Sequence, residues 1–317
     1  MYKEHTVAAV IPAYNESTQI KKVITTMPDY VDHIVITDDC SKDNTVEIIE
    51  SCLKDYPKVV LIKHEKNQGV GGAIATGYKW ARDNNIDTAV VMAGDGQMNP
   101  KDLPDLLDPV VEGVTDYSKA NRLIVGQSHK KIPKIRFFGN SALSFLTKIA
   151  SGYWHVADSQ TGYTVANKKV LHTLDWDNMY KRYGQPNDVL VKLNVHNFRV
   201  MDIAQEPVYN VGEASGINIK KAVFSIGWLI VKLFFWRLRE KYIIRDFHPL
   251  VLFYMMSFLF MFLSVILFLR LILLWISQGT APELTFIALL FTFGTSFQSA
   301  FFAMWMDMDY NRKQNFF

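Results

Sequence analysis

The sequence predicts an α/β protein in which an open, doubly wound sheet precedes a membrane-associated C-terminal part. Short apolar runs alternate with helical patterns across residues 7–92, as in sheets whose parallel strands are connected by helices. The charges are distributed unevenly, because only six of the 34 basic and 31 acidic residues lie among the last 70. This pattern excludes a disordered chain, a disulfide scaffold and a coiled coil.

The remaining composition excludes further classes. A net charge of +3 is too small to indicate a nucleic-acid-binding protein, so no nucleic-acid partner is expected. Cys40 and Cys52 form no framework and no CxxC pair, which favours a reducing compartment. The first residues lead directly into an apolar run, so we expect no signal peptide and place membrane insertion at the C-terminal end.

Four strands and three helices are predicted before residue 93. The first strand, Val7–Pro12, is apolar throughout, as expected for a parallel strand covered on both faces. Glu16–Thr26 has apolar residues at Ile20, Val23 and Ile24, the spacing of one helix face. The alternation continues with strands at His33–Thr37, Val59–His64 and Thr88–Met92 and with helices at Asp43–Tyr56 and Gly71–Asn84.

A polar loop follows each of these strands. Ligands of open α/β sheets bind beyond the carboxyl ends of the strands, where the four loops meet. Asp, Asn and Gly are also common in turns and helix caps, so any one loop could be purely structural. Four polar loops at one sheet edge favour a binding site. The glycine-rich loop at Asn67–Ala73 does not follow the first strand, as the glycine motif of dinucleotide-binding folds does, so a dinucleotide-binding fold is disfavoured. The loops contain Pro12–Glu16, Asp38–Thr45, Asn67–Ala73 and Ala93–Gln97.

Two apolar runs near the C-terminal end, Pro249–Ile276 and Leu284–Met306, exceed the about 20 residues that a membrane-spanning helix needs. The polar segment Ser277–Pro282 separates them. Arg270, inside the first run, could reach the headgroups or pair within a helix bundle. By the positive-inside rule, the flanking basic residues predict that both ends are cytoplasmic. These residues are Arg237, Arg239, Lys241, Arg245, Arg312 and Lys313.

A shorter apolar stretch, Ala222–Trp236, is interrupted by Lys232 and flanked by basic residues. This pattern predicts an amphipathic helix over 218–240 that lies in the membrane interface; the alternative is a core helix of the water-soluble part. We therefore expect a catalytic domain at 1–217, juxtamembrane helices at 218–247, and a transmembrane hairpin with a short cytoplasmic tail at 248–317.

The order of these motifs resembles the family 2 glycosyltransferases. Within that family it is similar to the polyprenyl-phosphate sugar transferases, such as dolichyl-phosphate mannose synthase and undecaprenyl-phosphate glucosyltransferases. The resemblance rests on Pro12–Glu16, Asp38–Thr45, the glycine loop and Asp95-Gly96-Gln97, followed by two terminal spans. It covers essentially the whole chain and implies a GT-A fold, a nucleotide-sugar-binding domain with a doubly wound mixed sheet.

The resemblance implies a donor site at the four loops. The first loop would line the slot for the base, and Asp39 would hold the base or ribose. Asp38 would assist or would only cap the turn. Gly69 and Gly71, with Asn67, would let the backbone approach the diphosphate. The full set of expected donor-binding residues is Pro12, Ala13, Tyr14, Glu16, Asp38, Asp39, Asn67, Gly69, Gly71 and Asp95.

A divalent metal, Mg²⁺ or Mn²⁺, is expected at the fourth loop, because the family's diphosphate leaving group needs neutralisation. Asp95 matches the second Asp of the family's Asp-x-Asp motif, and Gln97 matches a further ligand. The first Asp of the motif is Ala93 here. Water or a second diphosphate oxygen could take the missing position, which gives a weaker metal site. The alternative is a membrane-tethered nucleotide-sugar-binding protein without turnover.

The resemblance places acceptor binding in the middle of the chain. Arg122 and Arg136 match arginines that hold the acceptor phosphate, a role suited to a planar cationic fork; a solvated basic face is the alternative. Asp158 lies in the expected acceptor loop, and Asp188 could orient the acceptor, act as a base or cap a helix. With Asp95, these four residues are the expected catalytic set. Lys130, Lys131 and Lys134 are expected to meet anionic headgroups.

The implied reaction inverts the sugar carbon at the cytoplasmic membrane face. The phosphate oxygen of a polyprenyl phosphate attacks the anomeric carbon of a UDP- or GDP-sugar, with UDP favoured. Because that phosphate is already anionic, positioning and charge stabilisation would supply most of the catalysis. A lipid-linked oligosaccharide or another glycan is the alternative acceptor. The sugar, the choice between dolichol and undecaprenol, and the presence of a homo-oligomer stay open.

Overall fold

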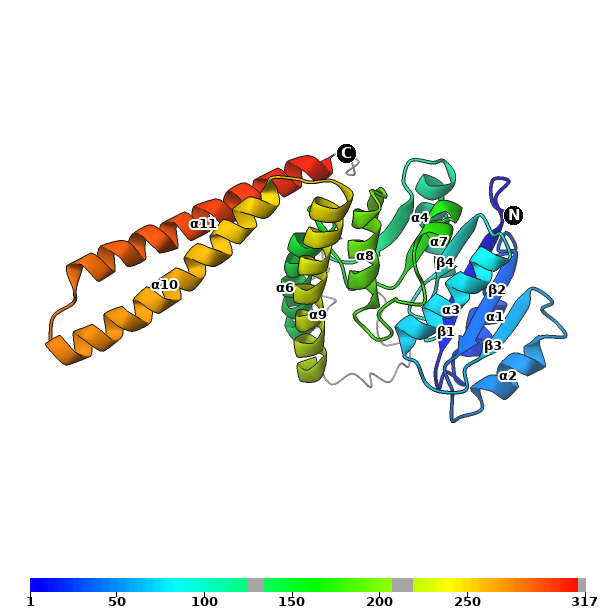
Figure 1. Ribbon diagram of the computed structural model, residues 1–317. Coiled ribbons are helices and arrows are strands. Elements are labelled where there is room, and N and C mark those ends of the chain that lie inside the picture. The colour runs from blue at the N-terminus through cyan, green and yellow to red at the C-terminus, as the bar shows by residue number, and fades with distance from the viewer. Residues whose placement is uncertain (125–133, 207–218, 313–317) are drawn as a thin grey trace. The chain divides into compact units, whose positions relative to one another are not determined.

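A computed structural model describes residues 1–124, 134–206 and 219–312, and for 134–138, 140 and 219–223 it describes the backbone alone (Figure 1). Within the described residues, one sheet has the order β3-β2-β1-β4-β6-β5-β7. β6 runs antiparallel to both neighbours, and the other pairs are parallel. The strands are β1 (Val7–Ala13), β2 (His33–Asp38), β3 (Val59–Lys63), β4 (Thr88–Val91), β5 (Tyr117–Asn121), β6 (Thr164–Asn167) and β7 (Val200–Ala204).

Helices cover both faces of this sheet, so the predicted doubly wound mixed sheet is confirmed. Ala8 and Val10 of β1 pack into one buried cluster with α3, α7 and α8. Their neighbours Val7, Ala9 and Ile11 pack into the other with α1, α2 and α4, because successive strand residues point to opposite faces. The helices are α1 (Ile20–Thr25), α2 (Thr45–Cys52), α3 (Val70–Asp83), α4 (Leu103–Val111, after the 3₁₀ turn η1, Pro100–Asp102), α7 (Lys168–Thr173) and α8 (Gln185–Val195).

The first helix is shorter than predicted, since it begins at Ile20 rather than Glu16. The backbone N–H groups of Asn15 and Glu16 donate to the hydroxyls of Ser41 and Thr45, at 2.9 and 2.8 Å. These bonds fix the chain after β1 as a loop that packs against the loop following β2. The residues preceding Ile20 therefore stay at the sheet edge.

A third buried cluster joins α6 (Lys134–Ser151) to α9 (Ile219–Arg239). Ile226 and Ile230 of α9 pack with Leu143 of α6 and Val191 of α8. The other side of α9 is also apolar, since Phe224 and Trp228 are 82% and 58% exposed. The helix expected over 218–240 is thus present, with one apolar face packed on the sheet-containing unit and one exposed.

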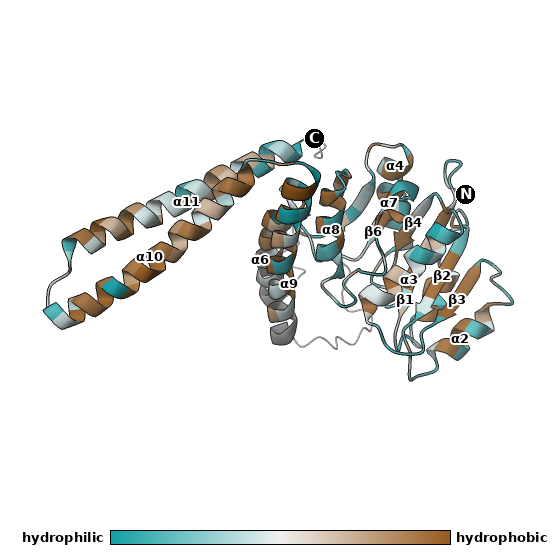
Figure 2. Ribbon diagram, viewed as in Figure 1, coloured by the Kyte–Doolittle hydropathy of each residue, from teal (hydrophilic) through white to brown (hydrophobic). Residues whose placement is uncertain are grey.

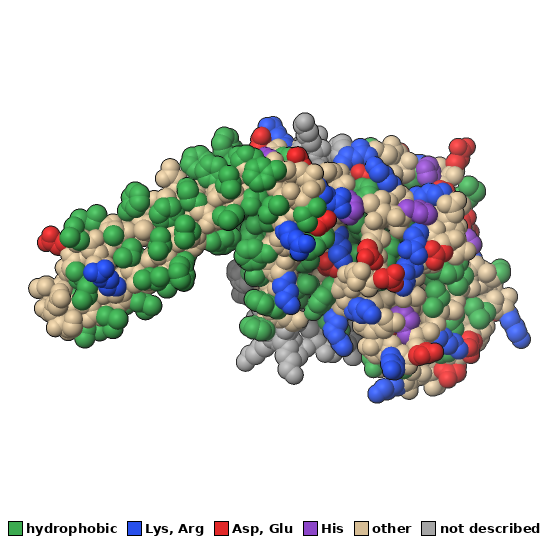
Figure 3. Space-filling view, in the orientation of Figure 1, with side chains coloured by type: hydrophobic (Ala, Val, Ile, Leu, Met, Phe, Trp, Pro, Cys, Tyr) green, Lys and Arg blue, Asp and Glu red, His purple; other side chains and the backbone are tan. Residues whose placement is uncertain are grey.

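The chain divides into two compact units, residues 1–234 and 235–313. The second contains the end of α9, a π-helical turn η2 (Glu240–Arg245), α10 (Leu250–Gln278) and α11 (Glu283–Asn311). By length and composition, α10 and α11 are the two described helices that could cross a membrane. Brown, hydrophobic residues predominate along α10 and recur along α11 (Figure 2), and hydrophobic side chains are widespread on the face of both helices that Figure 3 shows. α10 ends at Gly279, whose φ of +73° suits a glycine cap.

Small hydroxyl side chains join α10 to α11. Ser296 Oγ donates to the Ser257 carbonyl at 2.9 Å, and Ser264 Oγ donates to Thr292 Oγ1 at 2.9 Å. Such residues let apolar helices approach closely and satisfy each other's polar groups.

Two of the basic residues expected to flank the spans are buried instead. Both terminal nitrogens of Arg237 donate to the Asp307 carboxylate, at 2.9 and 3.0 Å, and Lys241 donates to Asn311 Oδ1 at 2.8 Å. Burial, and then the charge of Arg237, lower the pKa of Lys241 to about 6. The exposed flanking cations are therefore fewer than the sequence suggested; Arg239, Arg245 and Arg312 remain exposed.

Candidate active site

The loops after β1 and β4 meet at the point where the strand order reverses. β2 and β3 follow β1 on one side, whereas β4 lies on the other. A Cβ atom at Gly94 would lie 3.3 Å from the Pro12 carbonyl oxygen and 3.4 Å from Glu16 Cγ. Open α/β sheets bind their ligands at such a reversal. The sheet topology therefore places the candidate site at the edge that the sequence predicted.

The first loop offers one exposed aromatic ring and one perturbed carboxyl group. Tyr14 is 43% exposed, whereas Ala13 is buried. Glu16 is half-buried, and burial, followed by the charges of Asp95 and Asp43, raises its pKa to about 7. Glu16 therefore shares its electrostatic environment with Asp95, the carboxylate of the fourth loop.

The raised pKa of Glu16 predicts a measurable effect on stability. The folded protein binds this proton more tightly than the unfolded chain, so the free energy of unfolding falls as the pH rises from about 4.5 to about 7. The substitution Glu16→Gln is expected to remove this part of the slope and to raise the unfolding temperature above pH 7. Thermal unfolding of nucleotide-free protein across that range measures the effect, with exposed Glu47→Gln as the control. Equal slopes in wild type and Glu16→Gln would contradict it.

The two aspartates at the end of β2 have different partners. Asp39 accepts the backbone N–H groups of Gln68 and Gly69, both at 2.7 Å, and its Oδ1 lies 2.8 Å from His64 Nδ1. Asp38 accepts the Ser41 N–H at 3.1 Å through Oδ2. Its Oδ1 is buried and has no hydrogen-bond partner among the described residues. Asp39 thus holds the third loop, whereas one carboxylate oxygen of Asp38 has no partner among the described residues.

The glycines of the third loop are required by the protein's own packing. A Cβ atom at Gly69 would lie 2.5 Å from the Lys181 carbonyl oxygen, and one at Gly71 would collide with the Tyr180 carbonyl oxygen. Gly69 also has a φ of +87°. The resemblance attributed the small size of these glycines to a diphosphate. Nothing in residues 67–73 indicates contact with 180–185, so this packing could not be predicted from the sequence. Asn67 Nδ2 donates to the Asp39 carbonyl at 3.0 Å.

The fourth loop brings one carboxylate and one amide together. The Gln97 N–H donates to Asp95 Oδ1 at 3.0 Å, so both side chains leave one tight turn. No cluster of three or more His, Cys, Asp or Glu side chains able to hold a metal occurs among the described residues. A set of one carboxylate and one amide fits Mg²⁺ or Mn²⁺, which keep several waters and bind substrate phosphates. The residues present thus fit a metal bound together with the donor.

Two of the residues expected to bind the acceptor, Arg122 and Asp158, lie on loops at the same sheet edge. Because β6 is antiparallel to β4 and β5, the start of β6 and the end of β5 lie beside the end of β4. The hydroxyl of Tyr163 donates to the Asn99 carbonyl at 3.1 Å. Met98 Cε would lie 3.5 Å from a Cβ atom at Gly162. The loop that bears Asp95 therefore contacts the loop that bears Asp158.

Arg122 and Asp158 are bound to each other. Arg122 Nε donates to Asp158 Oδ2 at 2.8 Å and Nη2 donates to Oδ1 at 3.2 Å. Burial alone would raise the pKa of Asp158, but Arg122 and Lys119 hold it below its usual value. Asp158 is fully buried, whereas the Arg122 side chain is 26% exposed. The carboxylate therefore orients the guanidinium, and the guanidinium is the partner that can face a ligand.

Two further residues, Lys119 and Asp202, support this pair and were not among the residues predicted from the sequence. Lys119 is buried in β5 and donates to the Asp158 carbonyl and, at 3.3 Å, to Asp202 Oδ1 of β7. Asp202 also accepts the Ala157 N–H at 2.7 Å. Lys119 and Asp202 could have been recognised because each lies within a short strand, where a charged side chain is buried only when it is paired.

Asp188 lies within α8, where it is 3% exposed. Its Oδ2 accepts the Tyr180 N–H at 2.7 Å and Lys192 Nζ at 3.1 Å, and burial raises its pKa. Arg136 lies in the first turns of α6, and its side chain, like that of Lys134, is outside the description. Lys130 and Lys131 lie outside the described residues altogether.

Comparisons with known proteins show which family the chain resembles. Residues 8–175 match the profile described as Glycosyl transferase family 2. The chain is 33% identical to the UDP-N-acetylglucosamine–dolichyl-phosphate N-acetylglucosaminyltransferase of Methanococcus voltae, over 68% of this chain and 92% of that protein. It is 25% identical to the undecaprenyl-phosphate mannosyltransferase of Micrococcus luteus, over 74% and 96%.

A solved structure shares the fold. The glucosyl-3-phosphoglycerate synthase of Mycobacterium tuberculosis, crystallised with Mn²⁺, UDP and glucosyl-3-phosphoglycerate, matches with a TM-score of 0.51 and 16% identity. The match covers 74% of this chain and 80% of that one. Together with the profile over residues 8–175, it confirms the GT-A fold expected from the sequence. The chain therefore belongs to glycosyltransferase family 2 and is a glycosyltransferase.

Proposed function

We propose that this glycosyltransferase moves a sugar from a nucleotide sugar, with UDP favoured, to a polyprenyl phosphate. The observation that carries the proposal is that the loop bearing Asp95 contacts the loop bearing Asp158, whose buried carboxylate orients Arg122. The carboxylate of Asp95 would serve the metal-bound diphosphate of the donor, and the guanidinium of Arg122 suits the phosphate of the acceptor. The printed names of the relatives, a dolichyl-phosphate and an undecaprenyl-phosphate transferase, support the acceptor class.

The donor would lie across the four loops. The unpartnered Asp38 Oδ1 would accept a hydrogen bond from the base or ribose, and the exposed ring of Tyr14 would stack on the base. Asp95 and Gln97 would hold Mg²⁺ or Mn²⁺, which would neutralise the departing diphosphate. The solved neighbour that contains Mn²⁺ and UDP supports this choice.

Transfer would proceed with inversion at the anomeric carbon. The acceptor phosphate oxygen forms the new bond to that carbon while the bond to the diphosphate breaks, and the diphosphate leaves with the electron pair. Arg122, and Arg136 from the start of α6, would bring the acceptor phosphate in line. No protein base is required, because the attacking phosphate is already deprotonated near neutral pH.

The acceptor is a membrane lipid, and the C-terminal part would keep the site near it. In this proposal residues 1–217 form the catalytic domain, 218–247 lie in the cytoplasmic interface and 248–317 form the hairpin, with both termini cytoplasmic. The exposed apolar side of α9 supports an interfacial position, and Lys232, 5.6 Å from the Trp228 ring centre, adds a cation suited to anionic headgroups.

A donor panel tests the proposal. The purified full chain in detergent is mixed with a short-chain polyprenyl phosphate, Mn²⁺ and, in turn, UDP-N-acetylglucosamine, UDP-glucose and GDP-mannose. We expect one donor to yield a lipid-linked product with inverted configuration, and none with dephosphorylated polyprenol. Product formed only with a lipid-linked oligosaccharide would favour the alternative acceptor. Nucleotide binding without turnover would favour a tethered binding protein.

A further inference from the structure

The glycine loop of the donor side rests on a distant segment, residues 178–184, which we call the bracing segment. The Gly72 N–H donates to the Lys181 carbonyl at 3.1 Å. Gly69 and Gly71 leave no space for a Cβ atom against the carbonyls of Lys181 and Tyr180. The position of this loop therefore depends on where the backbone of the bracing segment lies.

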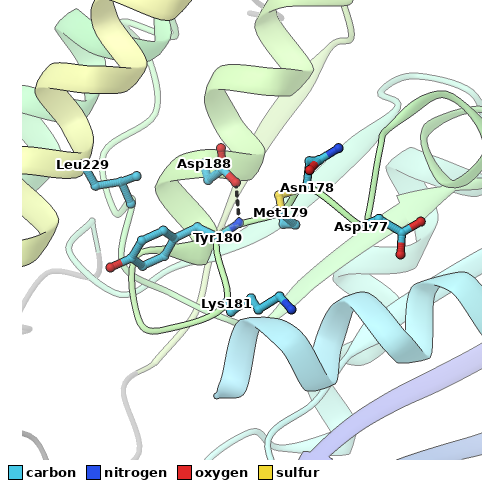
Figure 4. Close-up of a pocket in the computed structure, with 7 residues that line it drawn as sticks. All are labelled: Asp177, Asn178, Met179, Tyr180, Lys181, Asp188 and Leu229. Atoms are coloured by element: carbon cyan, nitrogen blue, oxygen red, sulfur yellow. Dashed lines mark hydrogen bonds between the residues drawn. The ribbon is translucent and has the colours of Figure 1, made fainter. Parts of the chain in front are cut away.

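Two charged residues of α8 hold the bracing segment. Asp188 Oδ2 accepts the Tyr180 N–H at 2.7 Å, the bond drawn in Figure 4. Lys192 Nζ donates to the Asn178 carbonyl at 2.6 Å and to Asp188 Oδ2 at 3.1 Å. Both are largely inaccessible, with side chains 5% and 14% exposed. The Asp188 carboxylate is thus engaged by the protein's own backbone and by Lys192.

The bracing segment packs against α9 and borders an open surface depression. Towards α9 it is confined, because a Cβ atom at Gly184 would lie 2.5 Å from Leu229 Cδ2, and Tyr180 Oη lies 3.1 Å from Ser225 Oγ. A cavity of about 430 Å³ adjoins it; the lining residues are Asp177, Asn178, Met179, Tyr180, Lys181, Asp188 and Leu229 (Figure 4). Without the bond from Tyr180 to Asp188, the segment can relax into this space.

We propose that Asp188 is a positioning residue of the donor site, which holds the bracing segment and, through it, the glycine loop against which a nucleoside diphosphate binds. This inference rests on the proposed function. The sequence led us to expect that Asp188 orients the acceptor or acts as a base. In this proposal Asp188 touches no substrate and acts through residues 180–181 on residues 69–72.

The substitution Asp188→Ala in the full chain tests this proposal. We expect the KM for UDP-N-acetylglucosamine, or for whichever donor the wild type uses, to rise about tenfold, since a buried N–H loses its acceptor. The KM for polyprenyl phosphate and kcat should change less than about twofold, and the pH profile should keep its shape. Hydrogen–deuterium exchange of residues 68–73 should become faster.

The conservative variant Asp188→Asn separates positioning from base catalysis. Asparagine retains an oxygen for the Tyr180 N–H but cannot accept a proton as a carboxylate does, so it should restore most of the donor affinity and slow the exchange. A base would be lost equally in both variants, and loss of kcat in Asp188→Asn would overturn the proposal. Asp177→Ala is the matched control, since Asp177 lines the same cavity but is 71% exposed and pairs with Lys79.

Two further outcomes keep the test decisive. If Asp188→Ala does not fold, the similarly sized Asp188→Leu replaces it, because that variant also removes the acceptor of the Tyr180 N–H; faster exchange of residues 68–73 would support the proposal and unchanged exchange would overturn it. A wild type without transfer from any donor would defeat the proposed function. The exchange measurement would still decide whether Asp188 controls the glycine loop.

Discussion

Replacing Asp95 by alanine is expected to lower the rate of sugar transfer about a thousandfold while leaving the fold intact. Asp95 is the single acidic residue between Thr88 and Lys101, because position 93 holds alanine. No other carboxylate of that loop can take over its charge towards a metal-bound diphosphate. The measurement is the initial rate with the active donor and polyprenyl phosphate across a series of Mn²⁺ concentrations.

Three controls frame this result. Gln97→Ala should cost about tenfold, since a neutral amide is the weaker ligand for a divalent cation. Asp105→Ala removes an exposed carboxylate from α4 and should leave the rate unchanged. The unfolding temperature of Asp95→Ala should stay near that of the wild type. Near-normal transfer by a folded Asp95→Ala protein would refute the metal assignment of this loop.

The first half of the sheet could be predicted from the sequence because its strands are apolar and its helices follow the helical period. The sequence also predicts a strand before Arg122, where β5 lies, but it does not predict β7. β5 reads Tyr-Ser-Lys-Ala-Asn and buries Lys119, whose charge is matched by Asp202 in β7. Such a pair joins positions far apart in the chain, and no local periodicity reveals it. The pairing of β5 with β7 therefore could not be predicted from the sequence.

The candidate site shows the same division. The carboxyl ends of parallel strands must share an edge, so the sequence brought the four loops together correctly. The sequence could not show which hydrogen-bond partner each carboxylate oxygen has. Asp38 and Asp39 are adjacent in sequence, but Asp39 holds the backbone of Gln68 and Gly69 while Asp38 retains a buried acceptor. The distinction depends on contacts with the third loop, which neither residue's local sequence encodes.

In the second unit, Arg237→Ala is expected to lower the free energy of unfolding by about 3–5 kcal/mol, since it leaves a buried carboxylate without its counter-charge. Arg237 and Asp307 are both 0% exposed and form two hydrogen bonds. Tyr242 and Asn311 also donate to Asp307, but neither carries a positive charge. Unfolding by SDS in mixed micelles measures the loss.

The matched control is Arg239→Ala, which removes an exposed arginine two residues further on and should change the free energy of unfolding by less than about 0.5 kcal/mol. The double variant Arg237→Met with Asp307→Leu should recover part of the loss, because replacing both charges by apolar groups leaves no uncompensated ion in the interior. Equal losses for Arg237→Ala and Arg239→Ala would mean that the buried pair does not form. A double variant as unstable as Arg237→Ala would show that the loss does not come from an uncompensated buried charge.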